Sequence, residues 1–380
     1  EMMMPLHDVG YRPWRGERRG SGHAVGVIAG TGIRLAWTSR WLRRAVFFAW
    51  SPALLFAASF FAFEQAVDQG RLGTMREQAR AGRDLDGVGV LGAVLARSLG
   101  TPPPGAQPFD ADTTRHTVWA RLLLAFMRAP QAVLLAVVVG LVAPTLISRD
   151  LRAKAWLVYF TRPVGRLEYI LGKMAVLGVL VAAITMLPAL ALWALGVLVS
   201  PSVWVAVATW DLPLKIILAS LTLAVPTVLM ALAYSSLTAE SRIASFAWFA
   251  TWAACWIAHT ALTTADLVAA AEVSRVSREE AAQESFFVDE AFGEFATVPA
   301  VRPRSAPRGF RWLSRAAGLD PEIDRWAWLS PYHALGVVQA WIFGIETRWQ
   351  AVLPPLVSLL AVTAVSSVVL WRRVDAPARA

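Results

Sequence analysis

The chain has 380 residues, of which 56% are hydrophobic and only 17% are charged, and its formal net charge is +9. Ordinary soluble domains carry about 25% charged residues, so this composition argues against a soluble protein. The arginines flank apolar stretches and form no soluble basic patch with interleaved aromatic residues, which argues against a nucleic-acid-binding protein. Cys255 is the only cysteine, which excludes a disulfide within the chain and makes a cysteine-based metal site improbable.

Six stretches of the sequence contain no Asp, Glu, Lys or Arg. They are Val46–Phe63, Gln131–Ser148, Met174–Ser200, Ile216–Ala239, Ile243–Ala265 and Ala351–Trp371. Each has about the ~17–25 residues that cross a bilayer as a helix. Backbone polar groups in lipid must be paired internally, so these stretches should be helical. The sequence therefore predicts an all-α polytopic membrane protein with six transmembrane helices.

The predicted membrane spans alternate with cytoplasmic and outer segments. In chain order they are a cytoplasmic N-terminus (1–44), span 1 (45–63), a long outer loop (64–128), span 2 (129–148), a cytoplasmic helix (149–165), span 3 (167–200), span 4 (213–237), span 5 (243–265), a second long outer loop (266–349), span 6 (350–371) and a cytoplasmic tail (372–380). Tryptophans near many span ends are typical of interfacial belts, although ordinary packing is an alternative explanation.

The end of the N-terminal segment predicts a helix that lies in the headgroup plane. Ile33, Trp37 and Trp41 recur at i, i+4 and i+8 on one face, and Arg43 and Arg44 are among the basic residues around the remainder. This is the pattern of an interfacial helix. The alternative is a cytoplasmic extension of span 1.

Charge in the short loops sets the expected orientation. Residues 1–44 contain eight Lys/Arg and residues 149–173 contain six, whereas 201–212 contain none. Positively charged short loops stay inside, so both termini should be cytoplasmic. The uncharged stretch 326–345 is interrupted at Ser330–Pro331, which predicts a re-entrant pair of short outer helices before the last span. A seventh span is the alternative for this stretch.

The connection after span 2 predicts an amphipathic cytoplasmic coupling helix. Leu151, Ala155 and Tyr159 recur at i, i+4 and i+8, and an acid near the helix start complements the helix dipole. Such a helix can insert into a groove of a partner protein. The candidate contact residues are Asp150, Leu151, Arg152, Ala155, Trp156, Tyr159, Phe160 and Arg162. A positively charged loop without a partner is the alternative. Glu168 is expected either to cap span 3 or to contact the partner.

The sequence contains no catalytic motif and no metal-binding motif. A Walker A motif, HExxH and GxSxG are all missing, so no catalytic or metal-ligating residue is assigned. Essentially one ionisable group, His259, lies in the apolar stretches, and a neutral histidine satisfied by a neighbouring helix explains it. The spans lack the buried carboxylates of a proton- or sodium-driven carrier, which favours energy supplied by another protein.

The region around residues 147–173 resembles the permease subunits of type 2 ABC exporters, in particular the six-span permeases of the gliding-motility and nitrous-oxide-reductase-maturation kind. The stretches that carry the resemblance are Ile147-Ser148-Arg149-Asp150-Leu151-Arg152, then Phe160-Thr161-Arg162-Pro163-Val164-Gly165-Arg166-Leu167-Glu168-Tyr169-Ile170-Leu171-Gly172-Lys173, and Leu329-Ser330-Pro331-Tyr332. Together these three stretches contain 24 residues, and both outer loops are longer than in the family's compact members.

The resemblance implies a permease without ATPase activity of its own. It implies two permease chains, in a homodimer or heterodimer, with separate ABC ATPase subunits that bind ATP and Mg and push on the 149–163 helix and the interfacial helix. A non-transporting subunit of a larger membrane complex is the alternative. The outer loop 266–349 carries aromatic residues among charged blocks, so it is expected to cap the outer mouth or to bind an outer-face protein, with a solvated loop as the alternative.

Overall fold

A computed structural model describes residues 21–68, 87–100, 111–128, 132–155, 165–292 and 324–375. Within these ranges the regular structure is helical and includes no strand. The predicted all-α architecture is therefore confirmed for the part of the chain that the structure describes.

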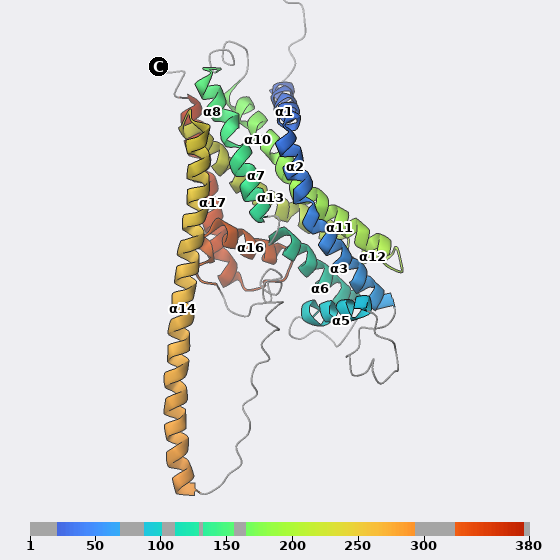
Figure 1. Cartoon of the computed structure of the whole chain (residues 1–380), viewed down its shortest axis with the longest axis vertical. Helices are drawn as coiled ribbons and strands as arrows, with labels where there is room; N and C mark the ends of the chain where they lie inside the picture. The colour runs from blue at the N-terminus through green and yellow to red at the C-terminus, as the bar shows by residue number, and fades with distance from the viewer. Residues whose placement is uncertain are drawn as a thin grey trace, which may run out of the picture.

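The helices form a bundle from which one long helix projects (Figure 1). They are α1 (Ser21–Thr38), α2 (Arg40–Ala49), α3 (Ser51–Asp68), α5 (Gly87–Leu99), α6 (Ala111–Phe126), α7 (Ala132–Val142), α8 (Pro144–Arg152), α10 (Arg166–Ile184), α11 (Met186–Val199), α12 (Val205–Ala208), α13 (Asp211–Leu237), α14 (Ser241–Phe292), the 3₁₀ helix η3 (Ala327–Leu329), α16 (Pro331–Ile342) and α17 (Trp349–Asp375).

Five helical stretches are long and apolar enough to cross a membrane. They are Arg40–Asp68, Val133–Arg152, Arg166–Val199, Asp211–Leu237 and Trp349–Val374. They coincide with predicted spans 1, 2, 3, 4 and 6. The chain is thus a multi-pass membrane protein by the length and composition of its helices.

Three of these candidate spans are interrupted once, each just before a proline. The breaks lie at Trp50, Ala143 and Thr185, and the prolines are Pro52, Pro144 and Pro188. Proline removes a backbone donor and its ring crowds the preceding turn, so a continuous helix is disfavoured there. Side-chain hydroxyl groups donate hydrogen bonds to backbone carbonyls beside two of the breaks. Ser51 Oγ donates to Phe48 O at 2.8 Å, and Thr185 Oγ1 donates to Val181 O at 2.9 Å.

The predicted fifth span, 243–265, is not among the five stretches. It lies in α14, a helix of 52 residues that continues far beyond it. The segment contains three tryptophans, four threonines and His259, which make it less apolar than the Leu- and Val-rich spans. The expected outer loop 266–349 therefore begins as a helix that runs to Phe292, and Figure 1 shows this helix projecting past the rest of the bundle.

The predicted interfacial helix has different bounds in the structure. Ile33 and Trp37 lie on α1, whereas Trp41, Arg43 and Arg44 lie on α2, at the start of the first candidate span. Extended Ser39 separates the two helices, and its side chain accepts a hydrogen bond from the amide of Leu42. Such an N-cap favours a new helix start at Arg40, so the five residues do not share one helix face.

In the described part of the expected outer loop 64–128, residues 64–68 complete α3, α5 packs on α3, and α6 packs on α3 and α11. Trp119 is fully buried, and its ring meets Phe60 edge-on with 5.5 Å between centroids. Phe56 and Phe126 form a second edge-on pair at 5.4 Å. This region, built from α3, α5, α6, α11 and the first part of α13, is called the aromatic end below.

The second core is mainly aliphatic and lies between α2, α7, α8, α10, α13, α14, α16 and α17. The 326–345 segment borders it as the short helix η3 followed by α16, with the break at Ser330–Pro331 where the sequence predicts one. Trp248 of α14 is buried in this core and donates from Nε1 to Ala136 O at 2.9 Å. The first part of α14 is therefore packed within the bundle against α7.

Candidate functional site at the basic end of the bundle

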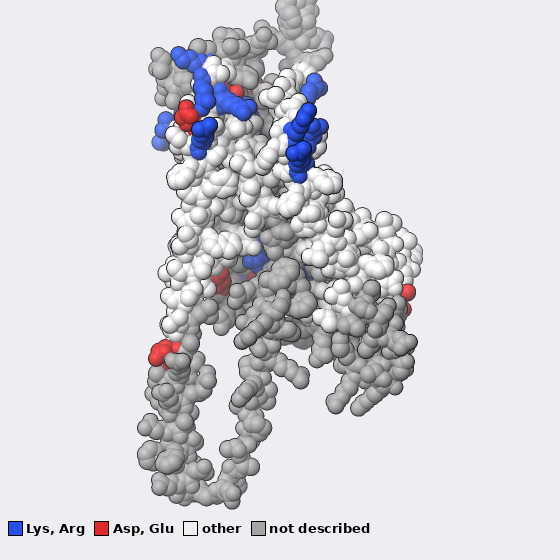
Figure 2. Space-filling model, viewed as in Figure 1, with Lys and Arg blue, Asp and Glu red and all other residues white. Residues whose placement is uncertain are grey.

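Basic side chains gather at one end of the bundle, which is called the basic end below. Figure 2 shows Lys and Arg atoms clustered over α8 and over α1 and α2, and the last turn of α17 carries Arg372 and Arg373 nearby. The candidate coupling residues Asp150, Leu151 and Arg152 lie here, in the last turn of α8. The structure thus brings the ends of several helices together where the sequence predicts a coupling element.

The end of α8 corrects the bounds of the predicted 149–165 helix. α8 stops at Arg152, and Ala153–Ala155 form a turn in which Lys154 has a left-handed backbone, with φ of 50°. The amide of Ala155 donates to the carbonyl of Asp150 at 2.9 Å, which closes the helix end. Leu151 and Ala155 therefore do not lie on one continuous helix face. The other candidate residues, Trp156, Tyr159, Phe160 and Arg162, lie outside the described residues.

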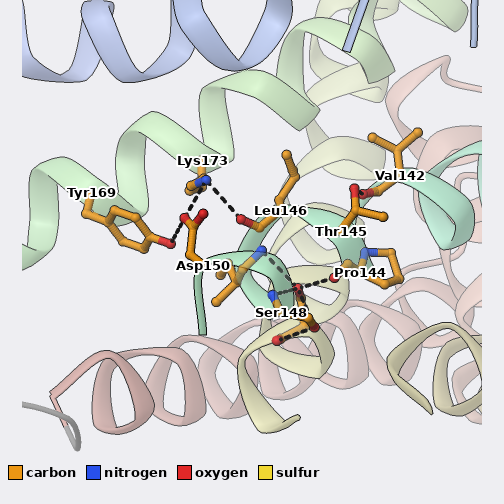
Figure 3. A network of polar contacts seen from close by, with 10 residues as sticks. Val142, Pro144, Thr145, Leu146, Ser148, Asp150, Tyr169 and Lys173 are labelled. Atoms are coloured by element: carbon orange, nitrogen blue, oxygen red, sulfur yellow. Dashed lines mark hydrogen bonds and ion pairs between the residues drawn. The ribbon is translucent and has the colours of Figure 1, made fainter. Parts of the chain in front are cut away.

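Asp150 joins α8 to α10 through two side chains (Figure 3). The hydroxyl of Tyr169 donates to Asp150 Oδ2 at 2.7 Å, and Lys173 Nζ lies 2.8 Å from the same oxygen. Lys173 also donates to Leu146 O at 2.9 Å. Tyr169 is fully buried and the two charged side chains are less than one-fifth exposed. Because the pair is largely removed from water, it is a stronger link than a surface salt bridge.

Ser235 joins the start of α8 to α13. Its Oγ accepts from the amides of Ile147 and Ser148, both at 3.1 Å, and donates to Pro144 O at 3.0 Å. Ser148 Oγ donates in turn to Ser235 O at 2.9 Å (Figure 3). Ile147 is the fourth residue of α8 and Ser148 the fifth, and amides at a helix start lack intrahelical partners. Ser235 of α13 therefore binds amides where the first turn of α8 meets the second.

Two further contacts fix the neighbouring helix ends. Arg152 reaches Glu240, in the turn between α13 and α14, at 2.9 Å, but both side chains are more than half exposed. The amide of Gly165 donates to Glu168 Oε2 at 2.7 Å, so Glu168 caps the start of α10. The capping role expected of Glu168 is confirmed.

This arrangement connects one short helix to two longer ones. No group of three or more His, Cys, Asp or Glu side chains in the described ranges could hold a metal ion. The last turn of α8 is tied to α10 by Asp150 and its first turn to α13 by Ser235. A displacement of the chain after Ala155 would therefore be transmitted to both helices.

Sequence reasoning did not single out Tyr169, Lys173, Ser148 or Ser235 as site residues. A signal existed for Lys173, because a lone cation near the start of an apolar span needs a counter-charge, and Asp150 lies one loop away. No comparable signal marks Ser235. Its partners are almost 90 residues away along the chain, and a serine in an apolar helix has many possible hydrogen-bond partners.

His259 has partners from the segment before α17 rather than from a neighbouring span. Its Nε2 lies 2.7 Å from Asp324 Oδ2, and its ring stacks on His333 with 3.5 Å between centroids. Trp256 packs against His333 as well. The cluster holds α14 against η3 and α16.

No protein-family model matches the chain, and no curated protein matches it either.

Proposed function

We propose that this chain is the membrane-spanning permease subunit of an ATP-driven, ABC exporter-type complex that moves its cargo with the energy of a separate ATPase subunit. The observation that carries the proposal is the junction at the end of α8. Asp150 and Ser235 tie this helix to α10 and α13, and the turn at Ala153–Ala155 leads into the segment 156–164, which resembles the coupling region of such permeases. A partner that binds this segment gains a direct mechanical connection to the spans.

The charge distribution supports a cytoplasmic position for the basic end. The start of α2, the end of α8, the start of α10 and the end of α17 all carry Lys or Arg, and such residues favour the cytoplasmic side. Both termini would then be cytoplasmic, in a bacterial inner membrane. An even number of spans is needed, and the first part of α14, packed against α7 through Trp248, supplies the sixth.

The proposed complex contains two permease chains and two ATPase subunits. ATP and Mg would bind in the ATPases, and this chain would contribute the path through the membrane. The segment of η3 and α16 would form the re-entrant pair at the outer surface, because neither helix is long enough to cross a bilayer.

Docking of the ATPase is the decisive test. The double substitution Tyr159→Asp and Phe160→Asp places two charges on the predicted apolar docking surface and should abolish co-purification of an ATPase from mild detergent. A matched control is Val203→Asp with Trp204→Asp, two exposed residues near α12 that lie away from the basic end. The control should retain the ATPase, and both variants should insert and unfold like the wild type. An intact complex with coupled ATP hydrolysis in the first variant would contradict the proposal.

Cysteine labelling tests the topology independently. On a Cys255→Ala background, an impermeant reagent added from outside should modify Val203→Cys but not Lys154→Cys or Arg373→Cys, all of which are exposed positions. Labelling of Arg373→Cys from outside would require an odd number of spans.

One observation favours the alternative of a non-transporting subunit. α14 has 52 residues, which is about 78 Å at 1.5 Å per residue and more than twice the ~30 Å hydrocarbon thickness. A helix that projects so far from the bundle provides a long surface for another protein. In that case purification would recover other membrane subunits and no ATPase.

A further inference from the structure

A groove opens on the surface of the bundle between α2 and α3 on one side and α11 on the other. Its volume is about 890 Å³, which lies within the ~300–1,000 Å³ typical of small-molecule sites. The walls are formed by apolar side chains, among them Phe47, Leu54, Ala191 and Leu195. Phe47 is 84% exposed and Leu54 is 75% exposed, so no described part of the chain covers these walls.

Two adjacent arginines, Arg43 and Arg44, lie at one end of this groove and are the only charged residues that line it. Neither side chain has a hydrogen-bond or ion-pair partner among the described residues. Arg115 and Arg152, by contrast, each pair with a carboxylate. Figure 2 shows the basic atoms over α2 continuing into an uncharged surface below them, over α3. The groove therefore combines a cationic end with an apolar length.

The dimensions of the groove match one leaflet of a bilayer. From Arg44 to Ala57, the last lining residue of α3, the chain advances 13 residues, or about 20 Å along a helix. Half of a hydrocarbon core is about 15 Å. The arginines belong to the first turns of the first candidate span, where long basic side chains reach the headgroup layer. A cation at headgroup depth above an apolar channel is complementary to a negatively charged lipid.

We propose that this groove binds one anionic phospholipid, whose headgroup phosphate contacts Arg43 and Arg44 and whose acyl chain lies between Phe47 and Leu54 on one side and Ala191 and Leu195 on the other. A second copy of the chain is a poorer fit, because it would have to bring a carboxylate to this cationic end. Among the acids of the candidate spans, Glu64, Asp150 and Asp211 already pair with cations of their own chain, and Glu168 caps α10. The remaining acid, Asp68, lies at the far end of the first candidate span from Arg43 and Arg44. The proposal requires only that the chain lies in a membrane and does not depend on an ATPase partner.

Lipid titration of the delipidated full-length chain in mild detergent, followed by native mass spectrometry, tests the proposal. Phosphatidylglycerol and phosphatidylcholine with identical acyl chains are the two probes. The wild type should bind one phosphatidylglycerol about thirtyfold more tightly than phosphatidylcholine, since two basic residues at roughly 1 kcal/mol each together favour an anionic headgroup. Arg43→Gln with Arg44→Gln should remove this preference, and Arg43→Lys with Arg44→Lys should retain most of it.

Two matched controls separate the groove from the general membrane surface. Arg372→Gln with Arg373→Gln removes an exposed basic pair of α17 at the same end of the bundle and should leave the preference unchanged. Ala191→Trp fills the groove from an exposed position of α11 and should weaken phosphatidylglycerol binding, whereas Val357→Trp on the exposed face of α17 should not.

Three results would overturn the proposal. Equal binding of the two lipids by the wild type would show only nonselective lipid contact. Full preference in Arg43→Gln/Arg44→Gln would place the anionic site elsewhere. Loss of a wild-type dimer in Ala191→Trp, with lipid binding unchanged, would identify the occupant as a second copy of the chain. None of these results affects the ATPase test, which is scored by co-purification.

Discussion

The two ends of the bundle hold their helices together in different ways. At the aromatic end, helices from distant parts of the chain share a continuous core. Within it the buried carboxylate of Glu64 lies 3.1 Å from Arg115 Nε and accepts a hydrogen bond from Trp119. At the basic end, α8 shares the aliphatic core through Ile147, and Asp150 and Ser235 add separate polar contacts to α10 and α13. Removing a hydrogen-bonding side chain there affects one helix end, whereas removing one partner of a buried ion pair leaves an uncompensated charge inside the core. The two ends should therefore respond differently to single substitutions.

The largest effect is expected from Glu64→Gln at the aromatic end. The substitution removes the carboxylate from a side chain that is fully buried beside Arg115, which is itself only 7% exposed. Breaking a buried ion pair from one side costs about 3–5 kcal/mol of unfolding free energy. Denaturant unfolding in detergent, followed by tryptophan fluorescence, measures the change. Glu240→Gln, which breaks the exposed pair with Arg152, is the control and should cost less than about 1 kcal/mol. Equal losses of unfolding free energy in Glu64→Gln and Glu240→Gln would contradict the expected difference between the two ends of the bundle.

A smaller effect is expected where α5 approaches α3 at Gly92. A Cβ at this position would collide with the backbone carbonyl of Ala62 and the side chain of Ala66. Gly92→Ala should therefore force the helices apart and cost about 1–3 kcal/mol, as other overpacked sites do. Gly178→Ala on α10 is the control, because a Cβ there meets no atom within 4 Å, and the better helix propensity should stabilise the protein by up to ~1 kcal/mol. If Gly92→Ala raised the melting temperature as Gly178→Ala does, the close approach of α5 to α3 at Gly92 would not matter for stability.

At the basic end, Ser235→Ala removes a hydroxyl that makes three hydrogen bonds to the backbone of α8, and it should cost about 1–3 kcal/mol and loosen the start of that helix. Amide exchange at Ile147 and Ser148, measured by mass spectrometry, should increase because both amides lose their acceptor. The control lies on the same helix: Ser220 Oγ is buried and has no hydrogen-bond partner in the ranges that the structure describes. Ser220→Ala should therefore be neutral or stabilising. Unchanged exchange in Ser235→Ala would contradict the capping role.

The smallest effect concerns pH and the contact between α14 and η3. Arg325 and Trp326 donate hydrogen bonds to Asp266, and the Arg325 hydrogen bond holds the pKa of Asp266 below its usual value. A carboxyl group with a lowered pKa stabilises the folded form above its usual pKa of about 4 and loses this effect as the pH falls through the lowered value. The protection of the amides around residues 324–329, expressed relative to their intrinsic exchange rate at each pH, should be unchanged from pH 8 to 5 and should fall only under more acidic conditions. A loss of protection near pH 6 would indicate a different titrating group.

The sequence predicted the candidate spans well because a bilayer imposes a length and a composition on each of them. Predicted span 3, 167–200, differs by one residue at each end from the observed Arg166–Val199. The helix break at Ser330–Pro331 and the cap by Glu168 were also predicted correctly, since both depend on residues close together in the chain. Local chemistry was sufficient in these cases.

The remainder of the fold depends on contacts between distant residues. α6 is buried on all sides from Leu122 to its end at Phe126, so this part shows no polar face that would mark it as a surface helix. The end of α8 depends on the left-handed backbone of Lys154, a residue type that does not signal this conformation. The pairing of Asp150 with Lys173 joins two helices, and only the need of Lys173 for a counter-charge indicates it in the sequence. Sequence periodicity therefore located the candidate coupling region but gave its helix the wrong bounds.

The unbroken course of α14 has a consequence for any protein that contacts its far end. Successive residues of an α-helix advance by about 1.5 Å and rotate by about 100°. Because Ser241–Phe292 forms one helix, the direction in which a residue near 290 points is set by the number of residues between it and the bundle. Insertion of a single residue after Asp266 would rotate the far end by more than a quarter of a turn, whereas insertion of seven would nearly restore its direction and lengthen the helix by about 10 Å. The length of the helix thus sets both the distance and the orientation at which its far end can contact another protein.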